Sequence, residues 1–253
     1  IRVAQLARNR FGIALPLAEL FAAPTVRDLA GVIDHALEHG TGTRARARMT
    51  MEEMAAEAQL DPSIQPPPGS TVPTHPPVHI LMTGATGFVG AHLLDELLRR
   101  TDAILYCIVR NVDDDDAAYT RLSAGLNRYG LWRKELAHRI VAVAGDLALP
   151  RLGLSDVQYT TFAEKIDTIY HLGAWVNLMY GYHNLKSINV HGTHEVLRFA
   201  TTHRLKRVHH VSTLSIMSSL ERQGQLIRED DPLNTVGSLF GGYAQSKWIG
   251  EKL

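Results

Sequence analysis

The sequence is poor in cysteine, in long apolar runs and in net charge. Cys107 is the single cysteine of 253 residues, so an internal disulfide framework is excluded and a cytoplasmic location is expected. No apolar run approaches the roughly 20 residues that a membrane-spanning helix needs. The 26 Lys and Arg residues balance 26 Asp and Glu residues, which argues against a chain-wide nucleic-acid surface. We therefore expect neither a membrane nor a nucleic acid as a partner.

Targeting and metal-binding patterns are missing as well. The chain opens on Ile1 and a polar, arginine-containing helical pattern rather than a signal peptide, and Leu253 interrupts a second helical pattern. We expect it to be a piece of a longer polypeptide.

Although there are thirteen histidines, no H-E-x-x-H motif occurs, and the adjacent His209 and His210 would face opposite sides of a strand. No metal site is predicted.

Changes in composition divide the chain into three parts. Residues 1–40 predict a small helical module, in which Thr25 and Asp28 form a capping-box-like helix start and Gly40 follows as a C-cap. Residues 41–77 predict a linker, because prolines gather there and favour extended chain. Residues 78–253 form the third part. The apolar residues at helical spacing in the first part are Val26, Leu29, Ala30, Ile33, Ala36 and Leu37.

In the third part, short apolar segments alternate with helical patterns. Strands are predicted at residues 78–82, 103–109, 140–144, 167–171 and 208–213, and helices at 90–100 and 189–202. Apolar strands that alternate with helices are typical of a parallel sheet covered on both faces. The predicted fold is α/β, a Rossmann-type doubly wound parallel sheet preceded by part of a small all-α bundle.

A glycine-rich turn lies between the first strand and the first helix. Gly84, Gly87 and Gly90 have the G-x-x-G-x-x-G spacing of the extended short-chain dehydrogenase/reductases. Such glycines permit a tight turn and a close approach of the backbone to a pyrophosphate, at which the following helix aims its free N–H groups. This context, between strand and helix, favours cofactor binding over a purely structural turn. The expected cofactor contacts are Thr83, Gly84, Thr86, Gly87, Phe88, Val89 and Gly90.

The end of the second strand predicts which dinucleotide binds. An NAD-selective fold usually places an acidic residue there for the ribose 2′-hydroxyl, whereas this chain has Arg110. A guanidinium suits a 2′-phosphate, so NADP(H) is favoured over NAD(H). Arg121 is a weaker second candidate, because the acidic residues 113–116 intervene. The alternative for Arg110 is a solvated arginine at a strand end.

Two more strand ends are expected beside the cofactor. Asp146 and Leu147 follow the third strand, at the position that usually contacts adenine. His171, Gly173 and Ala174 end the fourth strand and would lie near the nicotinamide half. His171 is equally compatible with a packed, purely structural strand end.

Tyr243 and Lys247 form a Y-x-x-x-K motif. Residues four apart on a helix share a face, so both side chains can enter one pocket. The lysine would bind the nicotinamide ribose and lower the pKa of the tyrosine, which is otherwise near 10. Thr213, at the end of the preceding strand, is the expected third member, with Ser212 as its close competitor. Residues of this type point to carbonyl reduction.

Segments along almost the whole chain resemble a carrier protein followed by a terminal thioester reductase. Residues 171–177, 189–193 and 212–215 are similar to the reductase domains of nonribosomal peptide synthetases, carboxylic acid reductases and aminoadipate reductase. Residues 58–64 are similar to the stretch before the glycine turn of those domains. Residues 11–26 resemble the back half of a peptidyl carrier domain. The family's phosphopantetheine serine would precede Ile1, and its C-terminal substrate lobe would follow Leu253.

The resemblance implies NADPH-dependent release of an acyl or peptidyl chain from phosphopantetheine as an aldehyde, and in some members further reduction to the alcohol. Tyr243 and Thr213 would assist the carbonyl and Lys247 would hold the ribose. The implied partners are adenylation or other synthetase domains upstream in the same polypeptide. Two alternatives stay open: another extended short-chain enzyme, such as a nucleotide-sugar epimerase or dehydratase, and a non-catalytic NADP-binding module.

Overall fold

The structure is a computed structural model of the 253-residue chain. It describes residues 2–13, 15, 23, 25–39, 49–178, 180–217, 219, 222, 224–233, 239 and 241–253. The predicted C-cap Gly40 lies outside the described residues.

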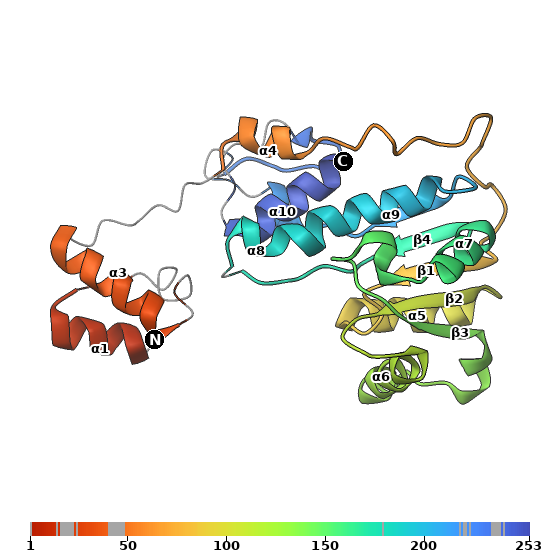
Figure 1. Ribbon diagram of the computed structural model, residues 1–253, viewed down its shortest axis with the longest axis horizontal. Helices are drawn as coiled ribbons and strands as arrows, with labels where there is room; N and C mark the ends of the chain where they lie inside the picture. Colours follow the sequence, from red (N-terminus) through yellow and green to blue (C-terminus); the bar gives the residue numbers. More distant parts are fainter. Residues whose placement is uncertain are drawn as a thin grey trace.

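Among its described residues, the N-terminal module contains two helices. Helices α1 (Arg2–Phe11) and α3 (Val26–His39) lie side by side (Figure 1) and share a small apolar cluster that includes Ala7, Ile13 and Ala36. The predicted start of α3 is confirmed, because the Asp28 backbone N–H donates to Thr25 Oγ1 at 3.1 Å and the Thr25 hydroxyl donates to the Asp28 carboxylate at 2.7 Å.

Residues 49–77 lie against the sheet domain. Helix α4 (Met51–Glu57) begins at a capping box formed by Thr50 and Glu53, and Met54 is fully buried in a cluster that also contains Trp248. Farther on, the Arg198 guanidinium donates to Asp61 at 2.6 Å. These contacts attach the segment to the surface of the third part of the chain.

A five-stranded parallel sheet organises the remainder, in the order β3-β2-β1-β4-β5 (Figure 1). The strands are β1 (His79–Thr83), β2 (Ile104–Val109), β3 (Ile140–Ala144), β4 (Thr168–His171) and β5 (Arg207–His210). The order reverses between β1 and β4, where doubly wound sheets bind ligands at the carboxyl ends of their strands. The predicted Rossmann-type parallel sheet is confirmed.

The sheet carries apolar side chains on both faces, so helices cover both faces. In β1, Ile80 and Met82 join one core cluster and Leu81 joins the other, as the two-residue period of a strand requires. Helices α5 (Phe88–Arg100) and α6 (Asp115–Arg128) cover the first face. Helices α7 (Asp156–Lys165) and α9 (Gly192–Thr201) cover the second.

Shorter elements complete the domain. Helix α8 (Tyr182–Lys186) runs into a π-helical turn, η3 (Ser187–His191), which leads directly into α9. The 3₁₀ turns are η1 (Lys134–Arg139), η2 (Pro150–Gly153) and η4 (Leu214–Met217), and α10 (Gly241–Lys252) carries the Y-x-x-x-K motif. In the part of the chain that the structure describes, none of the helices combines the length and apolarity needed to span a membrane.

The fifth strand is shorter than predicted. It was expected to reach residue 213, but β5 ends at His210. The Val211 N–H still donates to the His171 carbonyl at 2.9 Å. Beyond this bond β4 has already ended, so residues 212 and 213 have no neighbouring strand on that side and lie in a loop.

Candidate functional site

A cleft of about 460 Å³ opens at the carboxyl ends of the strands. It brings together the glycine turn, the ends of β2 and β3, the segment after β4 and helix α10. Of the residues predicted from sequence, it is lined by Thr83, Gly84, Thr86, Gly87, Phe88, Val89, Gly90, Arg110, Asp146, Leu147, Gly173, Ala174, Tyr243 and Lys247. Arg121, His171 and Thr213 are not among the lining residues. Ser212, the predicted competitor of Thr213, lines it as well, and Val176 and Ile188 line it without having been predicted as contacts.

The glycine turn is closed so tightly that side chains are excluded. Gly84 has φ +76°, and a Cβ there would lie 2.8 Å from the Gly173 nitrogen. A Cβ on Gly90 would lie 2.1 Å from the Gly84 carbonyl oxygen, the same oxygen that accepts a hydrogen bond from the Gly87 N–H at 3.0 Å. Gly84 therefore supplies the backbone conformation, and Gly90 the close packing of α5 on the turn.

Helix α5 starts at this turn without a side-chain cap. Its N-cap is Gly87, and no side chain bonds to its first N–H groups. Phe88 and Val89 in the first helical turn are 64% and 58% exposed at the cleft. Uncapped N–H groups and the positive end of the helix dipole fit a dinucleotide pyrophosphate. The turn thus has the shape and the donors that the predicted cofactor requires.

The two arginines differ in position. Arg110 is exposed and lines the cleft directly after β2. The Arg121 guanidinium donates to the backbone carbonyls of Arg110 at 3.1 Å and Asn111 at 3.3 Å, so it supports the loop that carries Arg110. Within the acidic run 113–116, Asp114 caps α6 and Asp115 accepts a hydrogen bond from the Ala144 N–H. Of the two arginines, Arg110 is therefore the better candidate for the predicted 2′-phosphate contact.

Asp146 and Leu147 form part of the cleft after β3. One Asp146 carboxylate oxygen accepts the Ala148 N–H at 2.8 Å, and the Asp146 N–H donates to the Leu152 carbonyl at 2.8 Å. Leu147 packs so closely on Gly173 that a Cβ there would meet its side chain at 2.5 Å. These contacts fix the loop opposite the glycine turn.

His171 is buried behind the cleft. Its Nδ1 lies 2.8 Å from the Thr83 hydroxyl and its Nε2 lies 3.3 Å from the Thr193 hydroxyl. Because Thr83 Oγ1 also accepts the Gly173 N–H at 2.9 Å, its own proton is free to go to Nδ1, which leaves Nε2–H to donate to Thr193. Burial lowers the pKa of His171 well below its usual value. The imidazole therefore joins β4 to the turn as a neutral group.

Asn189 is a positioning residue that sequence reasoning did not single out. Its side-chain amide bonds to both backbone groups of Trp175, at 2.7 and 3.2 Å, and donates to the Ser246 hydroxyl at 2.9 Å. The Ser246 hydroxyl in turn donates to the Tyr243 carbonyl at 2.9 Å. Asn189 lies on the π-helical turn η3, and it links the loop after β4 to helix α10. The family resemblance of residues 189–193 is the sequence signal that could have identified Asn189.

Tyr243 and Lys247 both line the cleft from α10. The Lys247 side chain is buried, its ammonium donates to the Val211 carbonyl at 2.8 Å, and it lies 3.1 Å from His210 Nε2. Burial lowers the pKa of Lys247 to about 8 and raises the pKa of Tyr243 above its usual value. The expected lowering of the tyrosine pKa is not what the structure shows, because burial removes the phenol from water and disfavours its charged form.

The third predicted member, Thr213, follows two residues that line the cleft, Val211 and Ser212. Its hydroxyl accepts the Ser215 N–H at 3.3 Å and lies 3.3 Å from the Ser215 hydroxyl. The neighbouring Ser212 lines the cleft, but its Oγ is enclosed and has no hydrogen-bond partner among the described residues. Both residues are partly exposed, and Thr213 is not among the residues that line the cleft.

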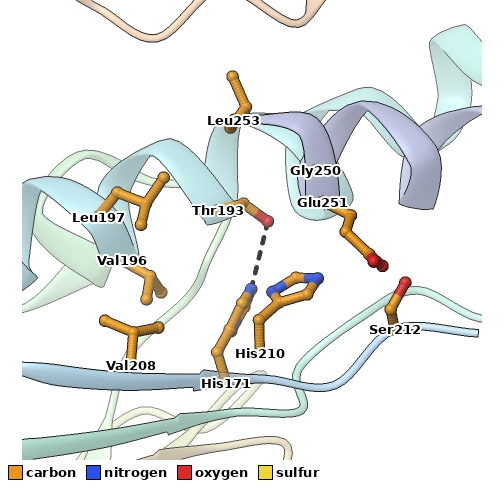
Figure 2. A pocket seen from close by; sticks show the side chains of 10 residues that line it. All are labelled: His171, Thr193, Val196, Leu197, Val208, His210, Ser212, Gly250, Glu251 and Leu253. Carbon is orange, nitrogen blue, oxygen red and sulfur yellow. Dashed lines mark hydrogen bonds between the residues drawn. The ribbon is translucent and has the colours of Figure 1, made fainter. Parts of the chain in front are cut away.

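A second cavity, of about 300 Å³, lies between β5 and the helices α9 and α10 (Figure 2). His171 and His210 stand side by side on its floor, with Thr193 above them. Ser212 lines both cavities, so the two lie next to each other. Within the described ranges, no three His, Cys, Asp or Glu side chains are placed to hold a metal ion.

Known proteins are similar to this chain in sequence and in fold. The family described as male sterility protein, a family of NAD-binding domains, matches residues 82–253. A linear gramicidin synthase from Brevibacillus parabrevis is 40% identical over 250 residues, which are 97% of this chain and 5% of that protein. The large subunit of L-2-aminoadipate reductase from Eremothecium gossypii is 34% identical over 277 residues, which cover 99% of this chain and 20% of that protein.

Solved structures agree with the sequence comparison. The terminal R domain from the myxalamid PKS-NRPS biosynthetic pathway superimposes with a TM-score of 0.75 and 47% identity, over 80% of this chain and 51% of that one. The chain thus spans about half of that domain and a small part of the curated relatives.

Proposed function

The chain belongs to the male sterility protein family of NAD-binding domains, and from this membership we propose that it is the NADP-binding part of a reductase that releases carrier-bound acyl thioesters as aldehydes. One observation carries the proposal: Tyr243 and Lys247 line the same cleft as the glycine turn and Arg110. Relatives named as an aminoadipate reductase and a terminal R domain support the reaction class.

The residues of the cleft suit this chemistry. Bound NADPH would supply the hydride that is added to the thioester carbon. The glycine turn and the start of α5 would hold the pyrophosphate, Arg110 the 2′-phosphate, and Lys247 the nicotinamide ribose. Tyr243 would donate its phenolic proton to the oxyanion that develops on the substrate, while the Thr213 hydroxyl donates a second hydrogen bond. The carbon–sulfur bond of the resulting hemithioacetal then breaks, and an aldehyde and a free thiol are formed.

We further propose how the chain is organised for this reaction. Residues 1–40 would be the C-terminal part of a carrier domain whose phosphopantetheine presents the acyl thioester. The contacts of Met54 and Asp61 support a tether in which residues 49–77 are attached to the reductase surface. Adenylation or other synthetase domains upstream in the same polypeptide would load the carrier.

The reaction is tested with the complete parent protein, loaded with an acyl-phosphopantetheine and mixed with NADPH. We expect loss of the reduced-nicotinamide absorbance together with an aldehyde among the products. Conversion of a nucleotide sugar without net consumption of NADPH would instead identify an epimerase, and tight NADPH binding without any turnover would identify a non-catalytic module.

Replacement of Arg110 by alanine is expected to weaken NADPH binding by about 10- to 100-fold, the range that one charge-assisted phosphate contact supplies. Binding of NADH, which lacks the 2′-phosphate, should change by less than about threefold by the same reasoning. Dissociation constants from quenching of protein fluorescence check this, with Arg128→Ala, at the end of α6, as the control. Equal losses for both cofactors would remove Arg110 from the 2′-phosphate site.

A further inference from the structure

We propose that His210 is a positioning residue for Lys247: its neutral imidazole accepts a hydrogen bond from the ammonium and holds that group in the cofactor cleft. The inference rests on the proposed function of the cleft, and it assigns a role to a histidine that the sequence patterns left without one. In this arrangement β5 controls the orientation of a side chain that belongs to α10.

The contacts of the ammonium define the arrangement. Lys247 Nζ lies 3.1 Å from His210 Nε2 and 2.8 Å from the Val211 carbonyl oxygen. Both partners belong to consecutive residues at the end of β5, and within the described residues they are the hydrogen-bond partners of this group. An ammonium has three N–H donors, so one remains for a molecule bound in the cleft. A lysine held by two fixed acceptors presents its third donor in one direction.

The hydrogen bond requires His210 to be neutral, with its proton on Nδ1 and a lone pair on Nε2. Burial and the charge of Lys247 lower the pKa of His210 to about 4, so the ring is uncharged near neutral pH. The adjacent His171 ring lies 5.2 Å away (Figure 2), and its low pKa keeps it neutral as well. No imidazolium therefore repels the ammonium from this side.

Two ionisable groups on the helix of Lys247 itself also lie near it. Glu251, one turn farther along α10, raises the pKa of Lys247, whereas burial lowers it to about 8. Tyr243, one turn earlier, has a raised pKa and stays a phenol near neutrality. A hydrogen bond to the charged form favours that form. His210 therefore helps the buried lysine to remain protonated at the pH at which the reductase would work.

The neighbouring histidine provides a matched control. His209 points to the opposite side of β5, as adjacent strand residues do, and its ring stacks on Tyr170 at 4.5 Å with an interplanar angle of 15°. The Lys247 ammonium bonds to His210 and Val211 rather than to this ring, and His209 lines neither of the two cavities. A substitution at His209 disturbs the same strand by a comparable amount but leaves the ammonium with both acceptors.

The test compares His210→Leu, His210→Gln and His209→Gln in the complete protein, through the dissociation constant of NADPH from about pH 6 to about pH 10. Loss of the acceptor in His210→Leu should weaken binding about tenfold near neutrality. It should also lower, by about one pH unit, the pH at which binding is lost as the lysine deprotonates. Glutamine keeps an acceptor oxygen at a similar reach and should restore both properties to within about threefold. His209→Gln should match the unsubstituted protein.

Two outcomes would overturn the proposal. One is an unchanged affinity and pH dependence in His210→Leu. The other is an equal loss in His210→Leu and His210→Gln accompanied by equal falls in the thermal unfolding temperature, which would indicate packing alone. Since binding is measured without a thioester, the result is distinct from that of the reaction itself: a protein that fails to reduce thioesters can still show the His210 effect on NADPH.

Discussion

Replacement of Tyr243 by phenylalanine is expected to lower kcat for thioester reduction by about 10²- to 10⁴-fold, the range of a lost general acid. The phenol lines the cleft beside Lys247, and burial raises its pKa. It is therefore fully protonated at neutral pH and is a donor rather than a base. Phenylalanine keeps the ring and removes only the proton donor, so NADPH affinity should change by less than about threefold. Single-turnover oxidation of NADPH by the acyl-loaded protein measures the effect.

Tyr119→Phe is a suitable control, because Tyr119 lies on α6 and is not a cleft residue. The centre of its ring lies 5.8 Å from the centre of the Trp132 ring. This variant should retain full activity. Normal thioester reduction by the Tyr243 variant would exclude Tyr243 as the proton donor. A loss of activity that is matched by a loss of NADPH affinity would assign Tyr243 to cofactor binding instead.

The fold was predictable because its signals are local. Strands with apolar residues on both faces, such as Ile80 to Met82, require cover on both sides and therefore predict a doubly wound sheet. The glycines of the turn identify the cofactor end of that sheet, since their spacing has meaning only between a strand and a helix. Tyr243 and Lys247 follow from helical spacing alone. For these features, the residues that matter are close together in the sequence.

The features that sequence reasoning missed depend on distant partners. The end of β5 is set by the end of β4, and the role of Asn189 is set by Trp175 and Ser246 on other elements. The pKa of Tyr243 depends on burial, which no spacing reveals. His171 was left open between two interpretations, and the structure places it behind the cleft with both ring nitrogens engaged by threonines. Such contacts span tens of residues and are fixed only when the sheet has formed.

The second large effect is expected when the glycine turn is filled. Gly90→Ala should weaken NADPH binding at least about 100-fold, because one added methyl group would lie 2.1 Å from the Gly84 carbonyl oxygen. That oxygen belongs to the backbone and cannot rotate away, so α5 must move off the turn. The pyrophosphate then loses the N–H donors at the start of the helix, and losing two or three charge-assisted hydrogen bonds accounts for the expected magnitude.

A graded series separates this local effect from general destabilisation. Gly87→Ala would place its Cβ 3.3 Å from the same oxygen, a contact that a small shift relieves, so its affinity should fall between that of Gly90→Ala and the unsubstituted protein. Gly125→Ala, within α6, meets nothing within 4 Å and should raise the stability by about 0.5–1 kcal/mol without changing NADPH binding. Thermal unfolding and NADPH titration of the three variants measure both quantities. If affinity followed the unfolding temperature across the series instead of the crowding at Gly84, the turn would be a structural element rather than the phosphate site, and the case for a dinucleotide at this end of the sheet would fail.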